Sequence, residues 1–258
     1  MIIDGNSLAQ IWLKDLKHQI TRLSPLSLGI VLVGDDLGSK IFIQKKKAVG
    51  ESLGVAIKIY SFDKNISIRD LQKEIKIIVA SVSGLIIQLP LPGFEAEDIV
   101  NLIPVQKDVD ALGAQPIVLA PAVLVVERLM KEFGFSRPDL KIAVFGQGQL
   151  IGQPVTKWAK SKGWQVSPID IDTPHPEALS VEADVVISGV GQPNLITAKM
   201  IKAGALVIDF GFSRENNQIK GDVDFQAIES KAIVTPTPGG TGPLVVAAVF
   251  QNLINLNK

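Results

Sequence analysis

Short apolar runs alternate with helical patterns along the first third of the chain. The runs are rich in β-branched residues and lack strict alternation of polar and apolar positions, which is typical of strands buried on both faces of a parallel sheet. The predicted strands are residues 28–33, 56–60 and 84–88, and the predicted helices are residues 7–23, 39–53 and 68–80. We expect Ser39 to cap the amino end of helix 39–53 and Gly54 to terminate it.

The same pattern resumes in the second half of the chain. An apolar helical segment, residues 121–135, is ended by Gly134 and followed by Arg137-Pro138, and we place a domain junction there. Beyond it, the predicted strands are residues 141–145, 165–169, 185–188, 206–210 and 232–235. We therefore predict the α/β fold class, with mostly parallel sheets in two domains.

Composition excludes several classes of function. The 258 residues are 47% hydrophobic and 20% charged, and 26 basic residues balance 26 acidic ones, so no net charge attracts nucleic acid or an anionic membrane. The apolar runs are too short to span a bilayer, and the first residues lack a signal-like pattern, so we expect a cytoplasmic protein. Without cysteine and with only two histidines, we expect no metal site.

A glycine-rich turn follows the predicted strand 141–145 and precedes a helical segment. Gly146, Gly148 and Gly152 would let backbone N–H groups approach a pyrophosphate at the amino end of that helix. The last spacing is one residue longer than in the usual fingerprint, and the alternative is a tight turn without a ligand. The order of strand, turn and helix favours nucleotide binding.

Acidic residues follow the next predicted strand. Asp170 and Asp172 lie about 20 positions beyond the turn, where a carboxylate binds a ribose 2′-hydroxyl and repels a 2′-phosphate. The turn has no arginine to offset that charge. The alternative for either residue is a solvated loop acid. We expect NAD rather than NADP as the cofactor.

Lys46 lies on an apolar stripe of the predicted helix 39–53. The stripe begins at Phe42, and its members follow at i+4, i+7 and i+11, with Lys46 at i+4. Lys45 and Lys47 point about 100° to either side of Lys46. The other members of the stripe are Phe42, Val49 and Leu53. Burial would lower the pKa of Lys46 and suit it to proton transfer. The alternative is a long side chain that reaches water.

Two further segments carry polar groups that need partners. Gln88 closes a buried strand, and a lysine or a polar ligand would satisfy its amide. Asp108 and Asp110 are two residues apart, which places them on one side of an extended segment. Asp110 suits the amino and ring N–H groups of a ligand, while Asp108 suits a local cap. The alternatives are a structural amide and a solvated acidic loop.

Residues 236–243 combine prolines and glycines so densely that we predict neither helix nor interior strand there. The segment follows a predicted strand and precedes a helical tail, residues 244–256. It is either a stiff connector or a rigid loop at the carboxyl end of a strand, where open α/β sheets bind ligands.

Taken together, these motifs resemble the bifunctional methylenetetrahydrofolate dehydrogenase/cyclohydrolase family along nearly the whole chain. The matching segments are residues 3–5, 33–46, 88–92, 104–110, 191–193, 221–225 and 236–243. The resemblance implies oxidation of methylenetetrahydrofolate to the methenyl form with NAD or NADP, followed by hydrolysis to 10-formyltetrahydrofolate. It also implies a homodimer that binds tetrahydrofolate derivatives.

The resemblance implies two α/β domains around a cleft. The folate-binding catalytic domain would comprise residues 1–121, rejoined by a final helix at residues 244–258. Residues 122–136 would form the connecting helix, and residues 137–243 a Rossmann-type dinucleotide-binding domain.

Site residues follow from the resemblance by motif position. Lys46 is similar to the catalytic lysine, Gln88 to its hydrogen-bonding partner and Asp110 to the pterin-binding carboxylate. The implied substrate-binding residues are Phe42, Leu89, Pro90, Pro236 and Gly239. The implied cofactor-binding residues are Gly146, Gln147, Gly148, Gly152 and Phe212, together with Asp170 and Asp172.

The chain departs from the family at several places, of which two bear on the reaction and the cofactor. The family usually has tyrosine at the position of Phe42, and a phenyl ring neither donates a hydrogen bond nor relays a proton, so we expect weakened hydrolysis. The family commonly has Gly-Arg-Ser where this chain has Gly146-Gln147-Gly148. Alternatives are a catalytically silent folate- or nucleotide-binding homologue, a monofunctional NAD-dependent dehydrogenase, and an unrelated amino- or hydroxy-acid dehydrogenase.

Overall fold

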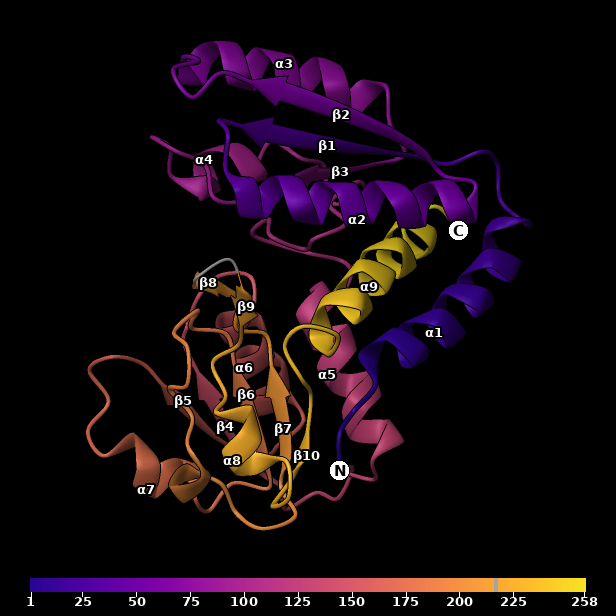
Figure 1. Cartoon of the computed structure of the whole chain (residues 1–258). Helices are drawn as coiled ribbons and strands as arrows, with labels where there is room; N and C mark the ends of the chain where they lie inside the picture. The colour runs from indigo at the N-terminus through magenta and orange to yellow at the C-terminus, as the bar shows by residue number, and fades with distance from the viewer. Residues whose placement is uncertain (216–217) are drawn as a thin grey trace. The chain divides into compact units, whose positions relative to one another are not determined.

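The computed structural model describes residues 1–215 and 218–258, which form two compact α/β units (Figure 1). The three-stranded unit comprises Gln10–Pro121 and Val246–Lys258, and the five-stranded unit comprises Met1–Ala9 and Ala122–Val245. Their boundaries fall inside three helices, α1 (Gly5–Ile20), α5 (Pro121–Glu132) and α9 (Thr241–Asn255). Within the described residues, no helix is both long enough and apolar enough to cross a membrane.

The sheet of the three-stranded unit is parallel, in the order β2-β1-β3. Its strands are β1 (Ser27–Val33), β2 (Ala56–Phe62) and β3 (Gly84–Ile87). The connecting helices α2 (Leu37–Leu53) and α3 (Ile68–Ala80) cover opposite faces, so β1 is buried on both sides (Figure 1). This double burial explains the nearly continuous apolar sequence of β1. β2 lies at the edge, and its residues are exposed or half-buried.

The ends of α2 show how local sequence fixes this helix. Asp36, rather than Ser39 as predicted, is the N-cap, and its carboxylate accepts a hydrogen bond from the backbone N–H of Ser39 at 2.6 Å. A carboxylate serves here because the amino end of a helix presents unpaired N–H groups and a positive dipole end. Gly54 ends α2 with φ +82°, as predicted, in the left-handed region that glycine adopts without steric cost.

The five-stranded unit contains a parallel sheet in the order β10-β7-β6-β4-β5. Its strands are β4 (Lys141–Phe145), β5 (Gln165–Ile169), β6 (Val185–Ser188), β7 (Leu206–Asp209) and β10 (Ile233–Val234). The chain goes from β4 to β5 on one side and then returns to β6 on the other. The carboxyl ends of β4 and β6 therefore flank a topological switch point, where such sheets bind ligands.

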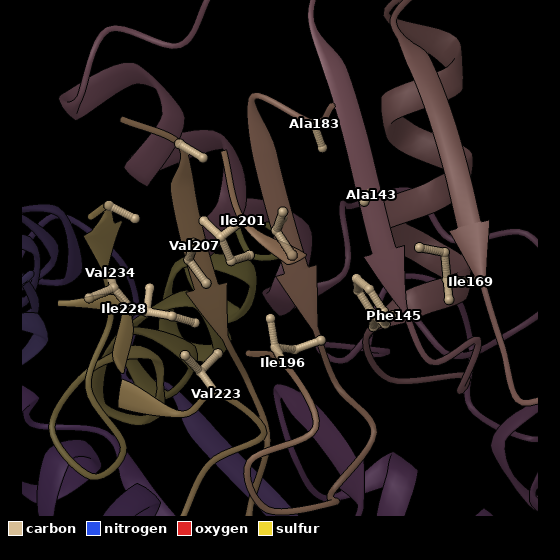
Figure 2. Close-up of a cluster of buried hydrophobic side chains, with 13 residues drawn as sticks. Ala143, Phe145, Ile169, Ala183, Ile196, Ile201, Val207, Val223, Ile228 and Val234 are labelled. Carbon is tan, nitrogen blue, oxygen red and sulfur yellow. The ribbon is translucent and has the colours of Figure 1, made fainter. Parts of the chain in front are cut away.

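A cluster of apolar side chains forms one core of this unit (Figure 2). Phe145, Ile169 and Val207 project from the sheet toward Ile196 and Ile228 of the covering segments (Figure 2). All of them are nearly inaccessible to solvent. The unit also contains short elements that the sequence pattern did not reveal: α7 (Pro176–Ser180), the 3₁₀ turn Ala198–Met200, the antiparallel pair β8 (Ser213–Glu215) and β9 (Gln218–Lys220), and α8 (Phe225–Ile228).

One prediction about the proline- and glycine-rich segment was wrong. Helix α9 begins at Thr241, so Gly242 and Pro243 lie in its first turn rather than in the preceding loop. Proline is compatible with the first turn of a helix because its missing N–H has no partner there in any case. The preceding strand β10 is also shorter than predicted. Other predicted bounds differ by a few residues, and α4 (Ala96–Val100) was not predicted.

Asn252 of α9 ties this helix to the chain around Asp110. Its side chain is 1% exposed and donates hydrogen bonds to the carbonyl oxygens of Val109 and Leu119, each at 2.8 Å. Asn252→Ala should lower the free energy of unfolding by about 2–4 kcal/mol, because one buried and one partly buried carbonyl group lose their donors. Urea unfolding measures this loss. The control Asn255→Ala, at an exposed position of the same helix, should cost less than about 1 kcal/mol, and equal losses would contradict the assignment.

Candidate functional site

Lys46 is buried in the three-stranded unit with only 6% of its surface exposed. The buried stripe of α2 consists of Ser39, Ile43, Lys46, Gly50 and Leu53. The stripe is therefore rotated from the predicted one, and Phe42 and Val49 are half-buried at its edge. The prediction that Lys46, rather than its lysine neighbours, faces apolar surroundings is confirmed.

A hydrogen bond joins Lys46 to Gln88. The Nζ atom donates to Oε1 of Gln88 at 3.0 Å, and Nε2 of the same amide donates to the carbonyl oxygen of Leu89 at 3.1 Å. The hydroxyl of Ser39 donates to that carbonyl as well, at 3.2 Å. Because its NH₂ group is engaged, Gln88 presents only an acceptor to Lys46. The amide thus holds the amine in place without supplying a charge.

Burial and a nearby carboxylate act on the charge of Lys46 in opposite directions. Burial lowers the pKa of Lys46, and attraction to Asp110 offsets part of that effect. Burial likewise raises the pKa of Asp110, and Lys46 opposes that rise. A buried ammonium with an uncharged hydrogen-bonding partner loses its proton more readily than an exposed one. Lys46 is therefore better suited to exchange protons than an exposed lysine is.

Asp108 and Asp110 have different partners. Asp108 is 3% exposed, and one of its carboxylate oxygens accepts a hydrogen bond from the backbone N–H of Gly113 at 2.8 Å. Asp108 therefore stabilises the local turn. Contrary to the prediction of an extended segment, residues 109–110 form a turn, and Ala111 has φ +55°. This conformation is costly for alanine, and it occurs directly beside the carboxylate that interacts with Lys46.

The remaining predicted substrate residues of this unit surround the same segments. Phe42 lies one helical turn before Lys46, and the ammonium of Lys45 lies 5.5 Å from the centre of its ring. Leu89 is half-buried and Pro90 is exposed, directly after Gln88. The structure thus brings Lys46, Gln88 and Asp110 together and leaves an aromatic ring at the edge of the stripe.

The turn after β4 contains three glycines with different surroundings. Gly146 has φ +79°, and a Cβ at Gly152 would lie 1.7 Å from the carbonyl oxygen of Gly146. Both positions therefore exclude side chains, one by conformation and one by close packing of α6 (Gly152–Ser161) on the turn. A Cβ at Gly148 would meet nothing within 4 Å among the described residues. Its backbone is open to a ligand, as in turns that bind a pyrophosphate.

Other predicted cofactor residues lie around this turn. The amide of Gln147 donates to the carbonyl oxygen of Val144 and accepts from the hydroxyl of Thr156, so it braces the turn internally. Asp170 and Asp172 are exposed beyond β5, and Gly146 N–H donates to the last carbonyl of that strand at 2.8 Å. The glycine turn and the two acids therefore share one edge of the sheet. Phe212 is half-buried in the segment after β7.

The loop with Pro236 and Gly239 packs on the start of α1. A Cβ at Gly5 would lie 1.8 Å from the carbonyl oxygen of Gly240, so backbone meets backbone there. Gly239 has φ +98°, which favours glycine. Both predicted residues are half-buried. This contact holds the loop rigidly beside β10.

Family models match both parts of the chain. The catalytic domain of tetrahydrofolate dehydrogenase/cyclohydrolase matches residues 3–110, and the NAD(P)-binding domain of the same family matches residues 120–258. The chain belongs to the tetrahydrofolate dehydrogenase/cyclohydrolase family. Its predicted resemblance is thus confirmed, and the five-stranded unit carries the family's NAD(P)-binding domain.

Relatives with curated names cover the chain from end to end. It is 33% identical to the bifunctional protein FolD of Mycoplasmopsis synoviae, over 100% of this chain and 99% of the relative. The FolD protein of Aquifex aeolicus is 31% identical over 100% and 95%. Among solved structures, a bifunctional FolD enzyme from Campylobacter jejuni superposes with a TM-score of 0.94 at 28% identity, covering 100% and 98% of the two chains.

A shikimate dehydrogenase from Aquifex aeolicus shares only the fold with this family member. Its TM-score is 0.62 at 13% identity, over 90% of this chain and 92% of that one. The two-unit α/β architecture is therefore common to enzymes with different chemistry, and the function must be argued from the site.

Sequence reasoning missed a pair of buried acids in the five-stranded unit. Asp209 at the end of β7 is 2% exposed, and Asp222 after β9 is fully buried. Burial raises the pKa of Asp209 to about 6, and the nearby charge of Asp222 adds to the rise. The available signal was a carboxylate ending an apolar strand, but the sequence did not show that residue 222 lies beside it. Among the described residues, no group of three or more potential ligands is placed to hold a metal ion.

The carboxyl of Asp209 should titrate with a midpoint near pH 6, measured by the carboxyl ¹³C chemical shift. In Asp222→Asn the midpoint should fall, because a repelling charge is removed. Since the pKa is higher in the folded than in the unfolded state, ionised Asp209 costs about 3 kcal/mol of stability above pH 6. That cost should fade as the pH drops from 6 toward 3.8. A midpoint near 3.8 in the wild-type protein would contradict this environment.

Proposed function

We propose that this chain oxidises methylenetetrahydrofolate to methenyltetrahydrofolate with a nicotinamide cofactor and hydrolyses the methenyl form to 10-formyltetrahydrofolate. The observation that carries the proposal is the buried pair of Lys46 and Gln88, within a chain that matches both domain models of the family. Relatives that bear the name bifunctional protein FolD support it along the full length of the chain.

Lys46 would manage the proton in the hydrolytic step. Water adds to the cationic methenyl carbon and must lose a proton, and the C–N5 bond then breaks as N5 gains one. The hydroxyl on the same carbon releases its remaining proton to solvent as the formyl C=O bond forms. A neutral amine can accept the first proton and return it to the leaving nitrogen. The lowered pKa of Lys46 favours that neutral form and avoids placing a second positive charge beside the cationic substrate. Gln88 would keep the lone pair of the amine directed by holding one N–H.

Asp110 and Phe42 would bind the pterin ring. A carboxylate complements the amino and ring N–H groups of a pterin, and a phenyl ring stacks on its face. Asp108 does not share this role, because its carboxylate is engaged by the turn that follows it. Leu89, Pro90, Pro236 and Gly239 complete the proposed set of substrate-binding residues.

The glycine turn would hold the nicotinamide dinucleotide, which accepts the hydride of the oxidation when bound. The turn fits this group because the backbone at Gly148 is unobstructed, whereas Gly146 and Gly152 shape the turn itself. Phe212 completes the proposed set of cofactor-binding residues. The protein residues contribute mainly alignment, which is what hydride transfer chiefly requires.

We further propose that NAD is preferred to NADP and that the protein is a cytoplasmic homodimer. Asp170 and Asp172 supply negative charge at the sheet edge that carries the glycine turn. Gln147 supplies no positive charge, and its amide is engaged within the protein. A 2′-phosphate would therefore meet two carboxylates without a compensating cation in the turn.

Lys46→Ala should reduce hydrolysis of methenyltetrahydrofolate by at least about 100-fold, because the only buried amine of the described site is removed. Loss of methenyl absorbance measures the rate. Lys47→Ala is the matched control, since Lys47 forms an exposed pair with Glu51 at 3.9 Å, and it should retain the wild-type rate within about twofold. Equal rates in wild type and Lys46→Ala would contradict the assigned role.

Phe42→Tyr should accelerate hydrolysis several-fold, because it adds a hydroxyl one helical turn from Lys46. The wild-type protein should oxidise methylenetetrahydrofolate faster than it hydrolyses methenyltetrahydrofolate. Both reactions are followed with methylene- and methenyltetrahydrofolate as separate substrates. The idea fails if the wild-type protein hydrolyses the methenyl compound far faster than it forms it while Phe42→Tyr adds nothing.

Turnover of methylenetetrahydrofolate should be faster with NAD than with NADP at equal concentration. The reduced-nicotinamide absorbance measures both rates. Asp172→Asn should narrow the difference by improving the reaction with NADP, because one repelling charge is removed. Comparable or better turnover with NADP in the wild-type protein would refute the preference.

A further inference from the structure

The buried carboxylates of Asp209 and Asp222 have no part in the proposed reactions. They are 2% and 0% exposed, and both lie in the five-stranded unit at the carboxyl side of the sheet. Burying two like charges side by side is costly unless many donors surround them. Their donors therefore indicate what the pair does.

Asp222 binds the segment that follows β6. One carboxylate oxygen accepts from the hydroxyl of Ser188 at 2.6 Å and from the N–H of Val190 at 2.8 Å. The other accepts from the N–H of Gln192 at 2.8 Å. Three donors spaced along residues 188–192 thus converge on one side chain. This bonding fixes the path of residues 189–192, which we name the β6 loop.

The β6 loop in turn contacts the glycine turn. A Cβ at Gly146 would lie 2.9 Å from the carbonyl oxygen of Gly189, and a Cβ at Gly189 would lie 2.8 Å from the side chain of Ile151. Backbone packs so closely here that neither segment can move without displacing the other. The position of the β6 loop therefore determines where the glycine turn presents its N–H groups.

Asp209 holds Asp222 in place from the other side. Its carboxylate accepts from the N–H groups of Gly211, Asp222 and Val223 at 2.7, 3.2 and 3.1 Å. A Cβ at Gly211 would lie 2.3 Å from the carboxyl carbon of Asp222, and one at Gly221 would lie 2.0 Å from a carboxylate oxygen of Asp209. Both acids thus occupy sockets that only glycine leaves open.

We infer that Asp222 is a positioning residue for the dinucleotide: it holds the β6 loop against the glycine turn in the arrangement that binds the cofactor, and Asp209 supports it. The inference rests on the proposed function of the glycine turn. Asp222 does not itself contact the cofactor in this account. In Asp222→Asn, an NH₂ group replaces one carboxylate oxygen and faces N–H or O–H donors of residues 188–192. Two donors cannot bond to each other, so the β6 loop loses its anchor.

The test compares Asp222→Asn with Asp224→Asn, the same substitution two residues away. Asp224 caps α8 by accepting from the N–H of Ala227, and asparagine caps helices equally well. Titration calorimetry should show NAD affinity at least about 10-fold weaker in Asp222→Asn and unchanged within about twofold in Asp224→Asn. Methenyl hydrolysis, which needs no dinucleotide, should stay within about threefold of wild type in both variants.

Ser188→Ala provides a milder variant should Asp222→Asn fail to fold. It removes one of the three donors to Asp222 and should weaken NAD binding about two- to fivefold. Unchanged NAD affinity in either folded variant would overturn the inference, and so would parallel losses of affinity and hydrolysis. A wild-type protein that binds NAD without turning over folate would refute the proposed function, while the affinities would still decide the inference.

Discussion

The chemistry proposed for this protein depends on burying an amine beside an uncharged acceptor. Lys46 would be an ordinary ammonium if it reached water or met a close carboxylate, and it would then release its proton too reluctantly to serve as a base. The fold prevents both outcomes. Gln88 receives the hydrogen bond, and Asp110 acts only through space, so its attraction moderates the effect of burial without cancelling it.

This arrangement follows from the way the three-stranded sheet is built. Gln88 directly follows β3, and its backbone N–H continues the pairing to β1 by donating to the carbonyl oxygen of Val31 at 2.9 Å. α2 packs on the sheet through a stripe that includes Ser39 and Lys46. Ser39 and the amide of Gln88 then share one carbonyl acceptor. Helix, strand end and loop are thus bonded together around the amine, which leaves it little conformational freedom.

The five-stranded unit addresses a different requirement, namely a rigid backbone surface for an anionic ligand. Glycines occupy the positions where segments approach closely, and buried carboxylates accept hydrogen bonds from the N–H groups of the loops. The acids cannot be replaced by apolar residues without leaving those N–H groups unpaired. Burying these carboxylates close together is electrostatically unfavourable, and the raised pKa of Asp209 reflects that.

Local patterns were sufficient to predict most strands, the glycine turn and the place of Lys46 on the apolar face of its helix, because each depends on residues close in sequence. The centre of the α2 stripe was misplaced because a glycine does not count as apolar in such a pattern. Gly50 nevertheless lies in the buried stripe, packed so closely that a Cβ there would lie 2.3 Å from Ile57. The N-cap was assigned to Ser39 because a serine at the start of an apolar pattern is the usual signal. The helix in fact begins earlier, and the carboxylate of Asp36 caps it by accepting from the backbone N–H of Ser39. The pairing of Asp209 with Asp222 depends on tertiary structure, which no spacing rule encodes.

The pKa of Lys46 tests the central claim most directly. Selective ¹³C labelling of lysine allows the Cε resonance of Lys46, assigned by its loss in Lys46→Arg, to be followed against pH. The account predicts a midpoint clearly below the ordinary value of 10.5, and a still lower midpoint in Asp110→Asn, where the moderating charge is gone. A midpoint at or above 10.5, unchanged by Asp110→Asn, would contradict it.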